Sequence, residues 1–210
     1  MPLPNLKIIR ESSCLRLCRA RPDGIFDVWA TLNFASYERM VLFYCTFVAM
    51  KHQDERGIPH RILLDKFELS TSDGQGEREY FAGVIRHGDM RHALRIFRDR
   101  SSGGVRLEAS AKRGAMQDVP IWTAFVTRYA EDPDWPQYEG SGMVSLAAVK
   151  PRPYVFLPRY EPARNSAGEY VLQFMTSEGE SLFEHSGVPF ADTSPDGKQF
   201  VEVWAALCRS

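Results

Sequence analysis

The segment that decides the fold spans residues 78–112 and reads REYFAGVIRHGDMRHALRIFRDRSSGGVRLEASAK. It holds three apolar-rich runs, and residues that favour tight turns separate them. Gly88 and Asp89 stand between the first two runs, and Ser-Ser-Gly-Gly at 101–104 stands between the last two. Glycine accepts positive φ without strain, and aspartate closes turns through its side chain. The spacing therefore predicts antiparallel strands that are joined by short hairpins.

The same pattern continues towards the C-terminus. Short runs rich in β-branched and aromatic residues alternate with stretches that are punctuated by glycine or proline. Regular spacing of this kind predicts an antiparallel sheet, a barrel or a sandwich. We expect seven strands in this part of the chain, at 78–86, 92–99, 105–112, 119–129, 143–149, 152–157 and 169–175.

Two helices are predicted after the last of these strands. Ser177 and Glu180 form a capping box, which begins a short helix that runs towards His185. Ser194 before Pro195 is a second helix start, because proline fits the first turn of a helix. The fold class that we predict is therefore α+β, with a curved antiparallel sheet capped by the terminal helix. The buried face of that helix is expected to hold Phe200, Val203, Trp204 and Leu207.

The beginning of the chain predicts a hairpin. The sequence Pro-Asp-Gly at 22–24 forms a turn between strands at 7–21 and 25–34. In the second strand, alternation puts one set of apolar side chains on a single face, which we expect to be buried. The members of this set are Phe26, Val28, Ala30, Leu32 and Phe34.

A helix is predicted directly after this hairpin. Ser36 is a favourable N-cap for a helix over 36–53, although the apolar run at 40–50 would also suit a buried strand. The length of the segment and its cap favour the helix. We expect residues 1–57 to form an N-terminal hairpin-plus-helix unit that packs on a main domain at 58–210.

Composition and charge bound the classes of function. A net charge of −1 and a hydrophobic content of 44% fit a globular protein, and nucleic-acid binding is disfavoured because no global field attracts an anion. The apolar run at 40–50 is too short for a membrane span, which needs roughly 20 residues. The first residues lack the features of a secretory signal, and the cysteines are sparse. We therefore expect a cytoplasmic or nuclear protein with reduced thiols.

Motifs of catalysis and of cofactor binding are missing from the sequence. It contains no nucleophile elbow, no phosphate-binding glycine loop and no pair of histidines at zinc-protease spacing. Cys14 and Cys18 lack a second ligand pair, and we expect His87 and His92 to be exposed turn residues rather than a metal site. We predict no metal and no cofactor. An active site assembled from distant residues stays open as the alternative.

Charge is segregated along the chain. Residues 86–113 carry eight basic and three acidic side chains, whereas residues 161–202 carry two basic and eight acidic ones. One interpretation is a basic surface for an anionic ligand and an acidic end for a basic partner. The other is that the two segments neutralise each other within the fold, in exposed pairs worth about 0.5 kcal/mol each.

The seven antiparallel strands, the basic first hairpin and the strand-to-helix finish at Phe174 resemble the pleckstrin-homology-like superfold, over residues 58–210. The phrases VWATLNF at 28–34, MVLFY at 40–44 and PIWTAFV at 120–126 are also similar to proteins of filamentous fungi. The resemblance implies a recognition function. It also implies that basic residues of the opening hairpin could bind phosphoinositides.

We predict a non-catalytic binding or scaffold module for a protein partner or for a second copy of the chain. The partner would dock at an exposed sheet edge or in the groove beside the terminal helix. Binding of a phosphoinositide or another anionic ligand at a basic patch is one alternative, and a small-molecule enzyme is the other. The candidate partner-binding residues are Arg16, Arg19, Arg21, Arg91, Arg95, Arg98 and Trp135.

Overall fold

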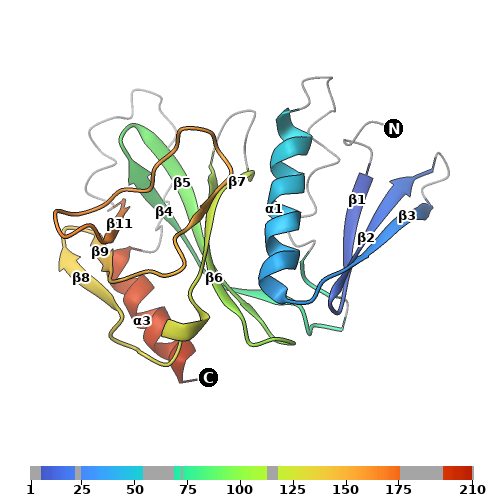
Figure 1. Ribbon diagram of the computed structural model, residues 1–210. Coiled ribbons are helices and arrows are strands. Elements are labelled where there is room, and N and C mark those ends of the chain that lie inside the picture. The colour runs from blue at the N-terminus through green and yellow to red at the C-terminus, as the bar shows by residue number, and fades with distance from the viewer. Residues whose placement is uncertain are drawn as a thin grey trace, which may run out of the picture.

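The chain folds into two antiparallel sheets with a helix between them (Figure 1). Strand β1 (Leu6–Glu11), β2 (Cys14–Ala20) and β3 (Phe26–Asn33) form the smaller sheet, and helix α1 is Tyr37–Gln53. The computed structural model describes residues 6–21, 25–53, 69–71, 73–112, 118–175 and 196–209.

The larger sheet is antiparallel and open. Its eight strands follow the order β10-β7-β6-β5-β4-β11-β9-β8, so β10 and β8 are its two edges. This confirms the predicted fold class in its open form, and the described strands do not close into a barrel. The strands are β4 (Glu77–His87), β5 (Met90–Asp99), β6 (Val105–Ala111), β7 (Pro120–Phe125), β8 (Pro136–Gly140), β9 (Met143–Leu146), β10 (Tyr154–Val155) and β11 (Tyr170–Phe174).

The smaller sheet departs from the sequence prediction at its first turn. The predicted strand at 7–21 is in fact two strands, β1 and β2, which pair from Leu6↔Arg19 to Glu11↔Cys14. Ser12 makes the turn with a left-handed φ of 50°. The turn uses serine, although serine is seldom found in this conformation. No glycine or proline therefore marks the turn in the sequence.

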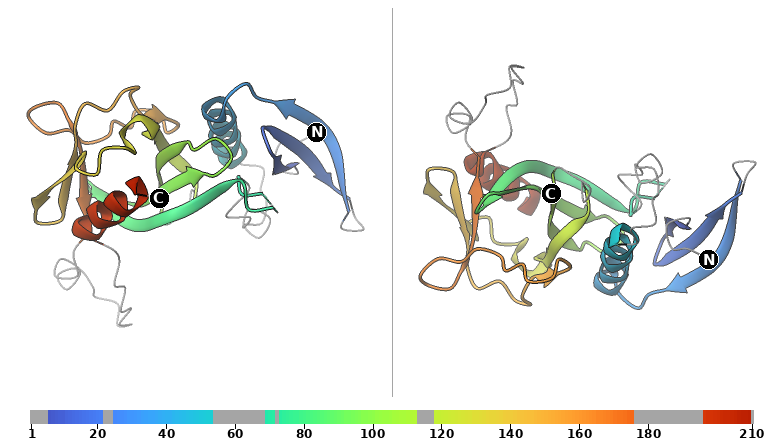
Figure 2. Two further views of the ribbon diagram at one scale, coloured as in Figure 1. Left: turned by 90° about the horizontal axis from the view of Figure 1, so that it is seen from below. Right: turned by 90° about the horizontal axis from the view of Figure 1, so that it is seen from above.

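Helix α1 is apolar on every side because it lies between the two sheets (Figures 1 and 2). Phe43 packs on Phe34 beside the small sheet, and Tyr37 meets Phe125 of β7 edge to face at a ring separation of 6.1 Å. The Lys51 ammonium donates to the Leu6 carbonyl at 2.8 Å. The predicted helix is therefore confirmed over the buried-strand alternative, and Ser36 accepts a hydrogen bond from the Arg39 amide as its cap.

Helix α3 (Gly197–Cys208) packs on the larger sheet and completes a second core, which contains Leu94, Leu107 and Phe174 (Figure 2). The helix buries Phe200, Trp204 and Leu207, as predicted, while Val203 is only half-buried. Its N-cap is Asp196, whose carboxylate accepts from the Gln199 amide at 2.9 Å.

The remaining differences concern strand limits. The predicted strand at 119–129 ends at Phe125 and continues as a 3-10 turn, Thr127–Tyr129, and the strand at 152–157 shortens to β10. Strand β8 is absent from the predicted set, because exposed side chains on a short edge strand resemble a loop in sequence. The turn at 22–24, the boundary at Gly57 and the helix near His185 lie outside the described residues.

A buried ion cluster joins α1 to the larger sheet. Arg106 of β6 holds Glu77 of β4 with two parallel bonds, from Nε at 2.7 Å and from Nη2 at 2.9 Å, and its Nη1 also pairs with Glu108. Tyr37 of α1 donates its hydroxyl to Glu77 at 2.5 Å. Burial alone would lower the pKa of Arg106, but the Glu108 and Glu77 carboxylates raise it. The cluster therefore stays charged inside the protein.

A second buried pair ties the smaller sheet to the larger one. Arg10 of β1 donates to Asp99 at the end of β5, at 2.6 Å, and to the Leu69 carbonyl at 3.0 Å. The other Asp99 oxygen accepts from Ser101 and from the Ser102 amide and hydroxyl. Although burial raises the pKa of Asp99, these bonds outweigh it and hold the pKa below its ordinary value. Each buried charge thus has its partners.

We predict that Arg106→Met lowers the free energy of unfolding by about 3–5 kcal/mol, because it leaves two buried carboxylates without a cation. Urea unfolding measures this loss. The matched control is Arg16→Met, which removes an exposed ion pair with Glu11 and should cost about 1 kcal/mol or less. Equal losses in the two variants would contradict the role assigned to Arg106.

Candidate binding surface

The edge strand β3 of the small sheet contains a β-bulge. On β2, Leu17 faces Ala30 of β3 and the next residue, Cys18, faces Val28, so Trp29 has no residue opposite it. Consecutive residues of a strand point to opposite faces. Val28 therefore lies on the outer face of the sheet, whereas Ala30 lies on the inner face, towards α1.

The bulge corrects the predicted alternation of this strand. Phe26 and Val28 were expected to share the buried face with Ala30 and Leu32, but the extra residue turns them outward. The sequence carries no sign of this shift, because the bulge uses ordinary residues in place of glycine. The result is a set of exposed apolar side chains at the beginning of β3. We call Ile25, Phe26, Val28 and Trp29 the β3 patch.

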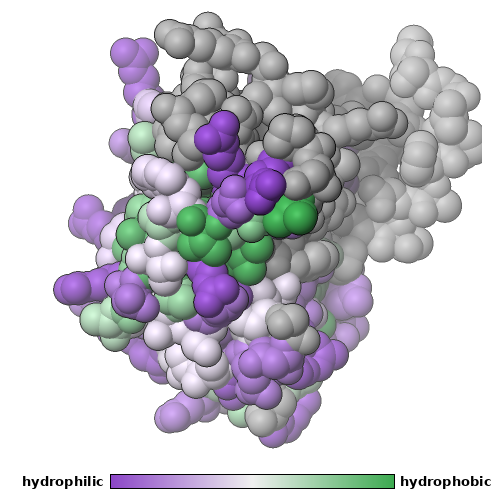
Figure 3. Space-filling model, turned by 90° about the vertical axis from the view of Figure 1, so that its right-hand side faces the viewer, coloured by the Kyte–Doolittle hydropathy of each residue, from purple (hydrophilic) through white to green (hydrophobic). Residues whose placement is uncertain are grey.

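The β3 patch is strongly exposed. Trp29 is 62% exposed, Ile25 57% and Val28 51%, which is high for large apolar side chains. Figure 3 views the molecule from the side of β1–β3 and shows an apolar area bordered by polar groups. Contiguous apolar area of this kind on a folded protein marks an interaction site.

Cations border the β3 patch on the same outer face. Lys7 faces Cys18 across β1 and β2, and its ammonium lies 5.1 Å from the centre of the Phe26 ring. Arg16, two residues before Cys18, lies on the same face and pairs with Glu11 at 2.7 Å. Two cations thus lie on the outer face beside the patch, and one of them is paired with Glu11.

The three hairpin arginines do not form one cluster. Arg16 and Arg19 stand on opposite faces of β2, because their positions along the strand differ by three. Arg21 lies at the end of the strand and pairs with Asp27 at 3.6 Å. Arg19 is exposed, and no ion pair involves it within the described part of the chain.

The arginines of β5 are also separated. Arg95 pairs with Asp118 at 3.2 Å and with Glu79 at 3.5 Å, so it holds neighbouring strands together. Arg98 points to the opposite face and donates to the Leu207 carbonyl of α3 at 3.2 Å. Arg91 is half-buried at the other end of the strand. Two of the three therefore make contacts within the fold.

Trp135 is buried, so its predicted exposure is wrong. Only 5% of it is exposed, its ring stacks on Tyr129 at a centroid distance of 4.4 Å, and its indole N–H donates to the Ala147 carbonyl. It also touches Trp204 of α3. The flat ring of Trp135 fills the space beside that helix and is not available to a partner.

The described residues hold no cluster of three or more His, Cys, Asp or Glu side chains that could bind a metal ion. Cys45 is not a candidate nucleophile, because burial and the nearby Glu108 carboxylate raise the pKa of its thiol. The expectation that His87 and His92 are exposed is wrong for His92, which is 1% exposed. Both imidazoles pack edge to face on Tyr160.

A large antiparallel sheet with a C-terminal helix packed on it agrees with the fold of a pleckstrin-homology (PH) domain. Two family models match the chain, one over residues 1–70 and one over residues 78–192, and both are described as a PH domain found in tandem in fungal proteins. The chain belongs to this family of tandem PH domains of fungal proteins. The match over residues 1–70 extends the similarity beyond the segment that the sequence suggested.

PH domains are typically non-catalytic binding modules, and they bind proteins or phosphoinositides. Among curated proteins and among solved structures, nothing was found to match the chain. Within the described ranges, neither helix has the length and apolar character needed to cross a membrane.

The buried histidine predicts a pH dependence of stability. Burial, together with the charge of His87, lowers the pKa of His92 from its ordinary value of 6.5. As the pH falls, the His92 imidazole therefore takes up a proton in the unfolded chain at a higher pH than in the folded chain. The stability contribution is complete above pH 6.5 and is lost as the pH falls through that value towards the lower folded-state pKa.

We predict that the wild-type protein loses more unfolding free energy than His92→Leu between about pH 7.5 and about pH 5. Urea titrations of both proteins at each pH measure the difference, in which the effects of the other titrating groups cancel. A steeper loss of unfolding free energy in His92→Leu than in the wild type would show that His92 does not cause the pH dependence.

Proposed function

We propose that this protein is a non-catalytic protein-binding module and that the β3 patch receives its partner. The observation that carries the proposal is the outward turn of Phe26 and Val28 at the bulge, next to the exposed Trp29. Tryptophan is enriched among the residues that dominate binding energy. Its exposure costs the free protein stability that burial against a partner would recover.

The partner is expected to lie on the face of the sheet rather than to add a strand at its edge. β3 is an edge strand, but the bulge at Trp29 interrupts the regular spacing of its hydrogen-bonding groups. Edge pairing needs an uninterrupted row of such groups. The side chains of the β3 patch, and not its backbone, are therefore the proposed contacts.

Charge around the β3 patch favours a partner with an apolar centre and an acidic border. Lys7 and Arg16 stand beside the patch, and Arg16 pairs with Glu11. A second copy docking patch to patch would bring these cations towards their own equivalents, which is unfavourable. We therefore commit to a different protein as the partner.

Phosphoinositide binding by the opening hairpin has less support. A multiply charged head group needs several cations that converge on one point. Arg16 and Arg19 lie on opposite faces of β2, and Arg16 and Arg21 are paired with carboxylates. Binding to phosphoinositide vesicles without a protein partner would contradict the proposal.

The double variant Val28→Ser/Trp29→Ser tests the proposal. A protein recovered on the immobilised wild type is identified and purified, and its affinity for each variant is measured by calorimetry. We expect the double variant to weaken binding about tenfold or more, since a tryptophan at the centre of an interface contributes on that order. The single variant Lys7→Glu should also weaken binding when it is measured at low salt.

Met50→Ser is the matched control, because Met50 is 50% exposed on α1 and outside the β3 patch. It should bind as the wild type does. Three results would refute the proposal: an unchanged affinity in the double variant, a concentration-dependent dimer that the double variant abolishes, or salt-sensitive binding to phosphoinositide vesicles without a protein partner.

A further inference from the structure

A cavity of about 520 Å³ lies where three strand ends meet the end of α1. Met90 begins β5, Ala111 ends β6 and Pro120 begins β7. These ends meet at one edge of the larger sheet, because the three strands are antiparallel neighbours. Ala49 lines the cavity from the side of the helix. Figure 1 shows the end of α1 and the beginning of β7 at the same end of the molecule.

Most of the described lining is apolar. Val119 and Ile121 stand at the beginning of β7, and Phe156 and Leu157 follow β10. The Phe156 amide donates to the Ile121 carbonyl at 2.8 Å, which holds this segment against β7. Pockets that bind small organic molecules have volumes of roughly 300–1,000 Å³, and this cavity falls within that range. Its walls favour a ligand with an apolar body.

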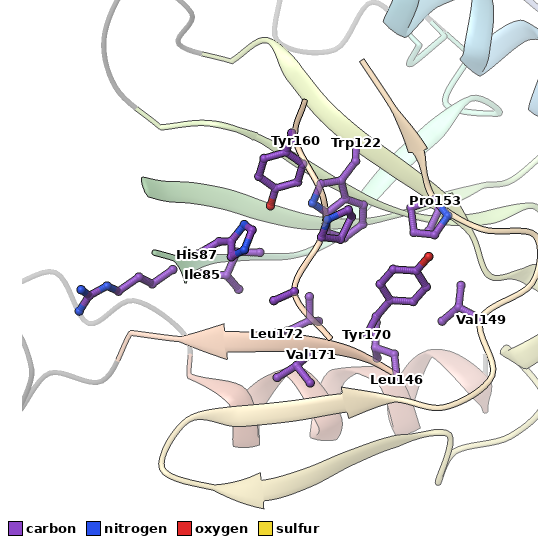
Figure 4. A pocket seen from close by; sticks show the side chains of 14 residues that line it. Ile85, His87, Trp122, Leu146, Val149, Pro153, Tyr160, Tyr170, Val171 and Leu172 are labelled. Atoms are coloured by element: carbon purple, nitrogen blue, oxygen red, sulfur yellow. The ribbon is translucent and has the colours of Figure 1, made fainter. Parts of the chain in front are cut away.

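The hollow drawn in Figure 4 does not offer a comparable site. It lies on the α3 side of the larger sheet, between β4, β7 and β11, and Trp122 and Tyr160 border it. Its enclosed volume of about 20 Å³ accepts about one water. Of these two spaces, only the cavity beside α1 has room for an organic ligand.

Two cations belong to the lining of the cavity. Arg91 lies on β5, and Lys112 directly follows β6. The paired positions of these strands end at His92↔Ala111, so Arg91 and Lys112 are the next neighbours in the same register. Like charges at neighbouring positions repel each other. An anion bound between them would relieve this repulsion.

Arg91 is the cation best placed to hold that anion. It lies on the face of β5 that α1 covers, because its position differs by six from that of Phe97, whose ring packs on the Arg106 guanidinium. The Arg91 side chain is half-buried, and among the described residues it makes no ion pair or hydrogen bond. Asp89 also lines the cavity, but it is fully exposed and lies 3.8 Å from Arg86. A bound carboxylate would give the Arg91 guanidinium two parallel N–H···O bonds.

We propose that this cavity binds an aliphatic carboxylate, such as a fatty acid. The carboxylate would accept from Arg91, and the hydrocarbon chain would lie against Phe156 and Leu157. A phosphorylated head group alone fits less well, because it would leave these apolar walls in contact with water. The ligand would touch both matched segments of the chain, since Ala49 lies within residues 1–70 and Arg91 within residues 78–192.

The test titrates sodium octanoate into the full chain labelled with ¹³C at the methionine methyl groups. The chain has seven methionines, and Met90→Leu identifies the signal of Met90, which lines the cavity. We expect a saturable shift of that signal with a dissociation constant on the order of 0.1 mM, and calorimetry should give the same constant. The signal of Met143, on β9, should not move.

Two further probes separate the two parts of the ligand. Octanol has the same chain without the charge, and it should bind on the order of tenfold more weakly than octanoate. Inositol trisphosphate has charge without a chain, and it should produce no comparable shift of the Met90 signal.

Arg91→Gln removes the cation, and it should weaken octanoate binding on the order of tenfold while octanol binding stays unchanged. The matched control is Arg39→Gln, because Arg39 is exposed in the first turn of α1, at the other end of the helix from Ala49. This control should bind octanoate as the wild type does. So should Val28→Ser/Trp29→Ser, because the β3 patch does not line the cavity.

Three results would overturn the proposal: no saturable shift of the Met90 signal with octanoate, equal affinities for octanol and octanoate, or unchanged octanoate binding in Arg91→Gln. Tighter binding of inositol trisphosphate than of octanoate would also refute it, because the site would then recognise a phosphate head group.

Discussion

The structure depends on a guanidinium that is held between two carboxylates where water cannot reach it. Arg106 is buried, so its charge is tolerable only while Glu77 and Glu108 stay within bonding distance. Glu77 and Glu108 lie on β4 and β6, the two neighbours of β5. Arg106 and Glu108 share β6, so a slip of either strand by one residue would put Arg106 and Glu77 on opposite faces of the sheet. The ion cluster therefore fixes the register of the central strands, and through Tyr37 it fixes the position of α1 on them.

This requirement determines what is left at the surface. β6 is buried along nearly its whole length because α1 covers one of its faces and the α3 core covers the other. Once α1 is placed, the inner face of the small sheet packs on it through Ile8 and Leu15. The outer face of that sheet is not covered by any other described element, and the bulge in β3 supplies it with apolar side chains. The other described sheet faces near α1 are packed against α1 or against the core that contains α3. The proposed docking surface is the described sheet face that this packing leaves uncovered.

Local signals predicted most of the fold, and long-range pairing accounts for the differences. Turn residues located the hairpins between β4, β5 and β6, and Ser36 located the start of α1. The turn at Ser12 and the bulge at Trp29 were missed, because neither uses glycine or proline. The burial of Trp135 depends on Tyr129 and on Trp204, which is distant in sequence. Of the predicted site residues, Arg16 lies beside the β3 patch, whereas the patch itself follows from a strand register that sequence alone does not reveal.

The pairing of Arg10 with Asp99 has a consequence for how this protein can change over generations. The two residues lie in the two separately matched segments of the chain, one on each side of the interval between residues 70 and 78. Exchange of either segment for that of another protein would strand a buried charge, unless the newcomer carried the complementary one. The two matched segments therefore depend on each other through this ion pair, because a change at Asp99 alone would leave the buried Arg10 guanidinium without its carboxylate.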